Sequence, residues 1–426
     1  MAGLTFHWFL PTQGDGRRLI EETRRAGVAG GPRGASLGYL TQVALAAEGL
    51  GFEGALTPTG LWCEDAWVIT AMLSQLTERL KFMIAFRPGL VSPTLAAQMA
   101  ATFQRQSGGR LLLNVVTGGD GAEQRALGDR LDKHARYERT AEFLSIVRAL
   151  WRGEQVDLQG ERLTVCGARL EQLPAPAPPI YFGGSSPIAL DVAARHVDVY
   201  LSWGEPPALL RSKLAAVSAA ASAHGRRLRL GIRLHVVCRD SAAEAWREAE
   251  RLLDGIPAET IAGVQRRLRD SESEGQRRMI SLHNGSASEL EVAPNLWAGV
   301  GLARGGAGTA LVGSHEEVAE RIEEYAALGI SEFVLSGYPH LEEAYWFGEG
   351  VLPVLRERGS WAGMRERPAA VGEATPAGDS RSSVPFTVGG ATPAAPARPA
   401  TPARPATPAR PATPAGLEAA GSVDVR

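Results

Sequence analysis

Short runs of β-forming residues alternate with longer helical patterns over residues 1–360, and this alternation constrains the fold more than any other feature. It predicts βα units and therefore a parallel sheet. The runs that we interpret as strands are Leu4–Leu10, Gly54–Pro58, Leu80–Phe86, Leu111–Thr117, Ile180–Gly183, Val199–Trp203, Leu228–Val237 and Glu332–Gly337. These eight units together predict an α/β protein with a (β/α)8 TIM barrel.

Two regions depart from the alternation. Residues 254–311 fit no simple βα unit and are predicted to form an insertion, whose glycine-rich end, Gly299–Gly308, predicts a mobile lid or a disordered surface loop. From about residue 361 the chain becomes rich in Pro, Ala and Thr, and the unit Ala-Thr-Pro-Ala-Arg-Pro repeats between Ala397 and Pro414. Such a composition predicts a disordered tail over residues 361–426, which leaves residues 1–360 as the folded domain.

Helix boundaries are marked clearly at two places. Ser314 and Glu317 form a capping-box pattern before the periodic segment Val318–Leu328, and Gly329 suits the left-handed position that ends it. Ser186 and Pro187 predict an N-cap and a first helical turn. Both patterns place a helix directly after or before a predicted strand, as a barrel requires.

Composition excludes several classes of function. Lys and Arg number 45 against 47 Asp and Glu, so there is no broad basic field for nucleic acid or anionic lipid. The cysteines Cys63, Cys166 and Cys238 form no CxxC pair, which argues against a disulfide framework and a cysteine-based metal site. No uncharged apolar run approaches membrane-spanning length. A reducing cytoplasm is therefore the expected setting, and no metal site is expected.

Small and hydroxyl residues at two predicted strand ends could hold a cofactor. The run Ile180–Pro187 places Ser185 and Ser186 at a helix N-terminus, where free amides favour a phosphate, although a well-capped helix explains the same residues. The run Asn114–Asp120 offers polar side chains and flexible backbone suited to lining a flavin ring, or forms an ordinary glycine turn.

Basic residues alternate in the predicted strand Gly231–Val237. Arg233 and His235 point to one face, so both enter the barrel if the aliphatic residues between them meet the helices. A buried arginine is costly unless an anion balances it, and the pair therefore favours an anionic ligand.

Further candidates follow other strands. Trp203 ends one predicted strand and Tyr338 directly follows another. Each is by itself most often a packing residue, but together they could enclose a small anion. Arg304 lies in the glycine-rich segment and could close over an anionic site. Cys63 is by default a buried thiol.

These segments resemble the FMNH2-dependent alkanesulfonate monooxygenases of the bacterial luciferase-like family. The matching stretches run up to about Val351: Phe9-Leu-Pro-Thr12 with Gly14-Asp-Gly16, Pro58-Thr-Gly60 with Cys63–Trp67, Tyr181–Ser186, Trp203–Pro207, Gly231–Val236, Pro294–Gly313 and Leu335–Tyr345. The resemblance implies a (β/α)8 barrel, a homotetramer, and FMN supplied as FMNH2 by a separate NAD(P)H-dependent flavin reductase, with O2 as co-substrate.

The same resemblance implies roles for individual residues. The active-site positions are Arg233, His235, Trp203, Tyr338, Cys63 and Arg304, and the flavin contacts are Asn114, Thr117, Tyr137, Ser185 and Ser186. This chain departs from the family at Gln13 and Lys133, where relatives carry histidine. Lys133 changes how the flavin phosphate would be held, since lysine offers a compact charge where imidazole offers a directed donor.

The expected reaction is oxidation of the carbon that bears sulfur in an alkanesulfonate, which releases an aldehyde and sulfite for sulfur assimilation. Three alternatives remain open: a luciferase-like monooxygenase with a non-sulfonate substrate, a cysteine-nucleophile hydrolase built around Cys63 and His235, and a sulfonate-binding protein without catalysis. Sulfite release that depends on flavin separates them.

Overall fold

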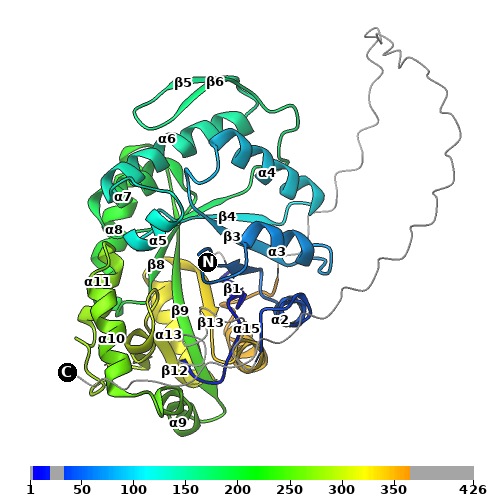
Figure 1. Ribbon diagram of the computed structural model, residues 1–426. Coiled ribbons are helices and arrows are strands. Elements are labelled where there is room, and N and C mark those ends of the chain that lie inside the picture. Colours follow the sequence, from blue (N-terminus) through cyan, green and yellow to red (C-terminus); the bar gives the residue numbers. More distant parts are fainter. Residues whose placement is uncertain (1–2, 20–32, 365–426) are drawn as a thin grey trace, which may run out of the picture. The chain divides into compact units, whose positions relative to one another are not determined.

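The computed structural model describes residues 3–19 and 33–364, and the predicted tail lies outside them apart from its first residues. Within these ranges, parallel strands close into an eight-stranded barrel with helices around its outside (Figure 1). Around the ring, the strands are β1 (Thr5–Phe9), β2 (Gly54–Thr57), β3 (Lys81–Phe86), β4 (Leu111–Val115), β7 (Ile180–Gly183), β8 (Val199–Trp203), β9 (Arg229–Arg239) and β13 (Ile330–Ser336). The predicted (β/α)8 fold and all its predicted strands are confirmed.

Helices follow the strands and cover them. They are α2 (Leu37–Leu50), α3 (Ala66–Leu73), α4 (Pro93–Gln106), α5 (Gly121–Ala126), α6 (Lys133–Trp151), α7 (Pro187–His196), α8 (Pro207–Ala223), α9 (Ala242–Leu253) and α13 (His315–Ala327). The segment after β13 contains α14 (His340–Tyr345), a π-helix η1 (Trp346–Val351) and α15 (Leu352–Glu357). Trp361, just past the predicted domain end, is buried and packs near Phe6, so the core extends to it.

The capping patterns are observed where the sequence predicts them. Ser314 and Glu317 form a reciprocal capping box at the start of α13, and Gly329 follows that helix with a φ of 94°. A small hairpin, β5 (Val156–Gln159) with β6 (Thr164–Ala168), extends beyond α6 and was not predicted (Figure 1).

The insertion is a folded unit. It contains α10 (Ala258–Arg269), α11 (Glu274–Ser281), β10 (Glu291–Ala293), β11 (Leu296–Trp297), α12 (Val300–Ala303) and β12 (Ala310–Ser314). Strand β9 pairs with β8 along its first half and with β12 along its second half, so β12 continues the barrel wall beyond the end of β8. This strand was missed because it lies at the predicted end of the insertion.

The barrel interior is layered. Its middle layer is apolar and is formed by residues from several strands, namely Met83, Leu112, Tyr181, Val199 and Val334. The residues between them in sequence face the helices and form the main core. Every second residue therefore points inward, and this parity extends to the residues at the strand ends.

A charged network closes the N-terminal end of the barrel. Glu332 is 1% exposed and accepts hydrogen bonds from the Tyr181 hydroxyl at 2.6 Å and from His7 Nε2 at 3.2 Å, and it forms an ion pair with Arg229. Burial raises the pKa of Glu332, but the His7 hydrogen bond and the charge of Arg229 hold the net pKa below its usual value. Charge at this end of a TIM barrel belongs to stability rather than to chemistry.

Candidate active site

The C-terminal ends of the strands bring the predicted basic residues together. Arg233 and His235 share the inward face of β9, and the alternate residues Ile232, Leu234 and Val236 are fully buried against the helices. Trp203 lies beside Arg233 in the register between β8 and β9. The predicted alternation is therefore observed, and it directs both basic side chains into the barrel.

Ser336 joins these two side chains. Its hydroxyl accepts a hydrogen bond from Arg233 Nη2 at 2.8 Å and lies 2.7 Å from His235 Nδ1, while His235 Nε2 lies 3.0 Å from the carbonyl of Ala307. A carbonyl can only accept, so Nε2 carries the proton and Nδ1 accepts from Ser336. Burial, followed by the charges of Arg233 and Arg304, holds the pKa of His235 well below its usual value. The imidazole is therefore neutral and oriented at both nitrogens.

Tyr338 and Arg304 complete this group. The Tyr338 ring stacks on His235 with 5.5 Å between centroids, and the Arg304 guanidinium lies 5.5 Å from the centre of the Tyr338 ring. Tyr338 is 1% exposed, and its hydroxyl has no hydrogen-bond partner within the described residues. Two arginines, one neutral histidine and one buried, unsatisfied hydroxyl thus lie around one point at the barrel mouth. Such a set suits a small anion.

A buried Asp–His pair adjoins Tyr338 and was not predicted as part of the site. Asp15 Oδ1 lies 2.9 Å from His340 Nδ1, and Asp15 Oδ2 accepts from the His340 backbone at 2.8 Å and from the Tyr39 hydroxyl. Burial raises the pKa of Asp15, but the charge and hydrogen bonds of His340 lower it by more, so the net pKa is below its usual value. His340 Nε2 is buried without a partner in the described chain, and the ring meets Tyr338 edge-on at 5.0 Å. The Gly14-Asp-Gly16 motif was a sequence signal for this pair.

The start of α7 has the properties of a phosphate cradle. Ser186 is its N-cap and Pro187 opens the helix, as predicted, but the Ser186 hydroxyl makes no capping hydrogen bond and is buried without a partner among the described residues. A Cβ on Gly184 would lie 2.6 Å from the Cβ of Ala189 and 3.3 Å from the Tyr137 hydroxyl. The glycine therefore allows the Tyr137 hydroxyl to approach the backbone of Gly184, directly before Ser185. An unpartnered hydroxyl at a helix N-terminus that has no side-chain cap fits an anionic group such as a phosphate.

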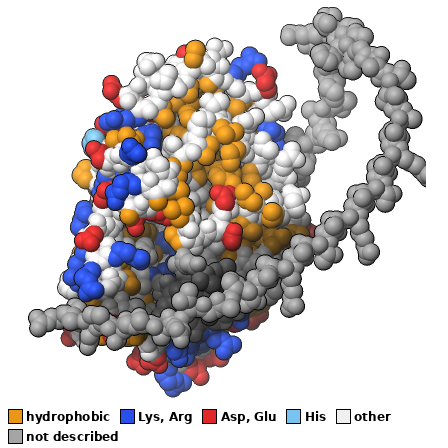
Figure 2. Space-filling model, in the orientation of Figure 1, with side chains coloured by type: hydrophobic (Ala, Val, Ile, Leu, Met, Phe, Trp, Pro, Cys, Tyr) orange, Lys and Arg blue, Asp and Glu red, His pale blue; other side chains and the backbone are white. Residues whose placement is uncertain are grey.

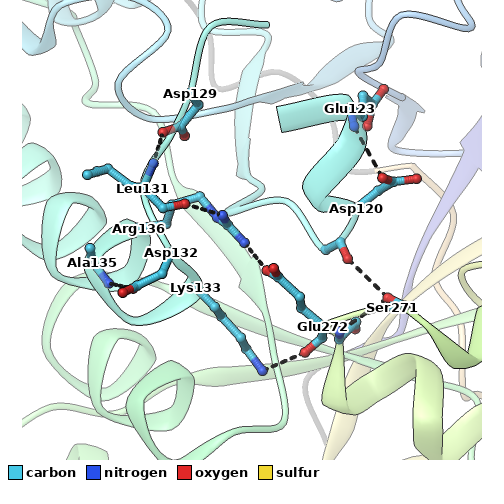
Figure 3. A network of polar contacts seen from close by, with 12 residues as sticks. Asp120, Glu123, Asp129, Leu131, Asp132, Lys133, Ala135, Arg136, Ser271 and Glu272 are labelled. Carbon is cyan, nitrogen blue, oxygen red and sulfur yellow. Dashed lines mark hydrogen bonds and ion pairs between the residues drawn. The ribbon is translucent and has the colours of Figure 1, made fainter. Parts of the chain in front are cut away.

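Lys133 is tied to the insertion. It donates to the backbone oxygen of Glu272 at 2.8 Å, and the Glu272 carboxylate forms an ion pair with Arg136 (Figure 3). Ser271 donates to the carbonyl of Gly119 at 3.1 Å, in the loop that follows Asn114 and Thr117. Burial and the charge of Arg277 lower the pKa of Lys133. This network fastens the insertion to the predicted flavin-contacting loop.

Helix α11 contacts the C-terminal end of β8 and the loop that carries Arg304. A Cβ on Gly275 would lie 3.1 Å from the Trp203 ring, and Gln276 Oε1 accepts from the backbone of Gly306 at 2.9 Å. Arg278 forms an ion pair with Glu205, the second residue after β8. The insertion therefore contacts Trp203 at the barrel mouth and the loop that carries Arg304.

Cys63 lies on a different side of the mouth from His235. Its thiol lies 3.5 Å from the carbonyl of Gly60, and its charged neighbours are Glu123, Arg87 and Asp65. Burial raises the pKa of Cys63 to about 11. The sulfur is thus a neutral thiol, and its described contacts do not include His235, so the arrangement gives no support to the predicted cysteine-nucleophile alternative.

The fold and this site define a TIM barrel with its chemistry at the C-terminal ends of the strands. Residues 4–332 match the family described as Luciferase-like monooxygenase. The chain belongs to that family.

Solved structures share the fold at low sequence identity. Riboflavin lyase RcaE, in complex with modified FMN and riboflavin, is 21% identical with a TM-score of 0.72, covering 86% of this chain and 94% of its own. DmoA from Hyphomicrobium sulfonivorans is 17% identical with a TM-score of 0.69 and coverages of 86% and 90%. EDTA monooxygenase EmoA from Chelativorans sp. BNC1 is 18% identical with a TM-score of 0.65 and coverages of 84% and 95%.

Among the residues that the structure describes, none of the helices combines the length and the apolar character needed to cross a bilayer.

Proposed function

We propose that this chain is a two-component flavin monooxygenase that desulfonates alkanesulfonates. The reaction consumes the sulfonate, O2 and FMNH2 and yields the aldehyde, hydrogen sulfite, FMN and water. One oxygen atom enters the aldehyde and the other leaves as water, so the reaction balances. The observation that carries the proposal is the convergence of Arg233 and Arg304 on the neutral His235 and on Tyr338 inside the barrel.

The two arginines suit a sulfonate. A sulfonate is a tetrahedral monoanion with three oxygen acceptors, and guanidinium groups bind such oxygens through charge-assisted hydrogen bonds. Because Ser336 fixes Arg233 and the stacking on Tyr338 places Arg304, both groups are oriented before a ligand arrives. Trp203 supplies apolar surface beside Arg233 for the alkyl chain.

FMN fits the other side of the mouth. Ser185 and Ser186 would hold its phosphate at the N-terminus of α7 together with Tyr137, and Asn114 and Thr117 would line its ring. Lys133 would bind the phosphate from the opposite side if its ammonium group exchanged the hydrogen bond to the Glu272 backbone oxygen for one to the phosphate. When bound, reduced FMN supplies the two electrons that the reaction with O2 requires. Among the solved structures, riboflavin lyase also contains a flavin on this fold.

Tyr338 is the better candidate for holding or moving a proton. Both nitrogens of His235 are engaged, one with Ser336 and one with Ala307, whereas the Tyr338 hydroxyl is buried and unpartnered in the described structure. His340, oriented by Asp15, lies against the same ring. We assign His235 to orienting Arg233 and the substrate, and Tyr338 to proton handling at its hydroxyl.

The insertion would exclude water. Helix α11 covers the mouth through Gly275 and Trp203, and it holds the Arg304 loop through Gln276 and Gly306. Excluding water strengthens the electrostatic contacts below it and protects reactive intermediates. The proposed lid is therefore the whole α10–α11 segment rather than the glycine-rich loop alone.

Two partners belong to the proposal. A separate NAD(P)H-dependent flavin reductase would supply FMNH2. A second copy of this chain would cover an apolar surface on α2, α3 and α4, where Leu45, Val68, Met72 and Leu95 are exposed. Figure 2 shows hydrophobic side chains gathered over the part of this face where α3 and α4 lie. Such a surface is consistent with the expected homotetramer.

The experiment is sulfite release from alkanesulfonates of increasing chain length, with a flavin reductase, NADPH, FMN and air. A parallel reaction without flavin is the control. Sulfite that requires flavin and O2 supports the proposal. Flavin reoxidation without sulfite would overturn the sulfonate as substrate and favour a luciferase-like monooxygenase with another substrate.

A further inference from the structure

A third arginine at the barrel mouth, Arg87, has no part in the sulfonate site. It directly follows β3 and shares the inward face of that strand with Met83 and Ala85. It is 7% exposed. A buried guanidinium remains charged at any physiological pH, so its position requires an explanation.

Only part of the Arg87 side chain is satisfied. Nη2 donates to Glu123 Oε2 at 2.5 Å, and the other oxygen of that carboxylate accepts from the backbone of Leu61 at 3.0 Å. Arg87 Nε and Nη1 are buried without hydrogen-bond partners in the described structure, and so is Nε2 of Gln124. Gln124 directly follows Glu123 and is 1% exposed. Buried donors without acceptors are costly, so this set of donors calls for an acceptor from a ligand or from water.

The topology separates this donor set from the sulfonate site. Going round the barrel, β3 is four strands from β9 in both directions, so Arg87 lies across the mouth from Arg233. The phosphate cradle at β7 lies between the two. Asn114 is on the neighbouring strand β4, paired with Ala85, and belongs to the proposed flavin side. A flavin whose phosphate is at α7 would thus have its ring between Arg87 and the sulfonate site.

The chemistry of reduced flavin matches these donors. The pyrimidine edge of the flavin ring carries adjacent acceptors at N1 and at the C2 carbonyl, and in the reduced form N1 loses its proton and leaves a negative charge there. The guanidinium of Arg87 can donate a charge-assisted hydrogen bond to such an edge from Nε or Nη1, and its charge favours the anionic form over the neutral oxidised form. We propose that Arg87 binds the pyrimidine edge of reduced FMN and gives the protein its preference for the reduced cofactor. This inference rests on the flavin dependence proposed above.

The test measures binding rather than turnover. Oxidised and reduced FMN are titrated into the full-length protein by fluorescence, the reduced form anaerobically, with wild type, R87Q, R87K and R148Q. The control R148Q removes an arginine of α6 that pairs with Asp198, the residue before β8, outside the barrel. Thermal unfolding of each variant identifies any that fail to fold. If R87Q fails to fold, R87K, which keeps the positive charge, takes its place in the comparison.

We expect R87Q to weaken binding of reduced FMN about tenfold and of oxidised FMN by less than about threefold. The ratio of the two affinities then changes about threefold to tenfold, which corresponds to about 15–30 mV in the two-electron potential of the bound flavin. R87K should fall between R87Q and wild type, because it keeps the charge and loses the planar fork. R148Q should match wild type.

Three results overturn the inference. Equal weakening of both flavin forms would mean that Arg87 does not discriminate between them. Unchanged flavin binding in R87Q, with a higher KM only for sulfonates that carry a second, distal anionic group, would assign Arg87 to substrate. Failure of the wild-type protein to bind either form of FMN would overturn the proposed flavin function itself. This outcome differs from the other two because binding is already absent before any substitution.

Discussion

Ser336 determines how the two basic residues of β9 behave. It accepts from Arg233 and donates to His235, so a single hydroxyl fixes a guanidinium and the tautomer of an imidazole. These hydrogen bonds cannot be predicted from the sequence of β9 or of β13 alone. They depend on the register between the two strands, which pairs Ser336 with His235. Preorganised charge of this kind is more effective than charge that must be ordered during binding.

Arg233 is the residue whose loss should most affect sulfonate binding. We expect R233A to raise KM for an alkanesulfonate about tenfold to a hundredfold, because a charge-assisted hydrogen bond to the anion is lost. R233K should recover part of the loss. The measurement is steady-state sulfite release, with R148A as a control that removes an arginine outside the barrel. Full activity of R233A at low substrate concentration would rule out the anion-binding role.

Cys63 should be a slow nucleophile. Because burial raises the pKa of its thiol to about 11, very little thiolate exists at pH 7.5, and its fraction rises only as the pH approaches that value. Cys166 is exposed and serves as an internal control in the same chain. We expect iodoacetamide to modify Cys166 well before Cys63, as followed by peptide mass spectrometry. Equal rates at pH 7.5 would restore Cys63 as a reactive residue.

The residues that sequence predicted best are those on regular strands. The alternation around Arg233 and His235 is local, and the structure places both inside the barrel. The contacts of Arg87 and His340 depend on loops and on residues far away in sequence, such as Asp15, so no short pattern reveals them. The same alternation along Lys81–Phe86 predicts that the next residue, Arg87, points inward at the mouth of the barrel.

At the scale of the strands, the network around Glu332 closes the lower end of the barrel. We expect E332Q to lower the free energy of unfolding by about 2–3 kcal/mol, somewhat less than for a fully buried pair because Arg229 is half exposed. The folded-state pKa of Glu332 lies below its ordinary value of 4.5, so the stabilisation is present above about pH 4.5 and is lost as the pH falls through the lower value.

Urea unfolding between pH 3 and 7 measures this effect. E323Q is the control, since Glu323 pairs with Arg358 at the surface and should contribute less than about 1 kcal/mol. If E332Q and E323Q lower the free energy of unfolding by the same amount at pH 7, the network around Glu332 contributes no more than a surface ion pair.

At the scale of the helices, Gly275 allows α11 to lie on Trp203. A Cβ there already approaches the indole to 3.1 Å, so G275V should displace α11 from the mouth. We expect faster proteolysis within residues 270–308 and a higher KM for sulfonate. In α10 a Cβ on Gly263 has no neighbour closer than 3.8 Å, which makes G263V the matched control. If G275V and G263V were equally resistant to proteolysis, the position of α11 would not depend on the contact between Gly275 and Trp203.

Elements with regular periodicity were predicted well, and those that depend on partners were not. The strands of the ring agree with prediction to within a few residues because each has its own hydrophobic run. Strand β12 and the short pair β10–β11 exist through pairing with β9 and with one another. The insertion was therefore recognised as an interruption but not as a folded unit.

At the scale of the whole molecule, the apolar surface on α2, α3 and α4 should control assembly. Val68 is 57% and Met72 49% exposed on consecutive turns of α3. We expect the double substitution V68E and M72E to dissociate the proposed homotetramer, because charges would be buried at the interface between copies. Size-exclusion chromatography with light scattering measures the mass.

L173E is the control for this prediction, since Leu173 is 39% exposed on a loop outside these helices. An assembly that survives the double substitution but not L173E would place the interface elsewhere. A wild-type monomer would contradict the oligomer altogether.

Strand β9 changes partners halfway along its length, from β8 to β12, and this has a consequence for how the family can diversify. The strand that carries Arg233 and His235 is also the one to which the insertion returns. Residues 258–293 can therefore be lengthened, shortened or exchanged while both ends of the replacement remain anchored to the same wall. Substrate range could be altered by grafting this segment from one relative to another, with the anion-binding residues left in register.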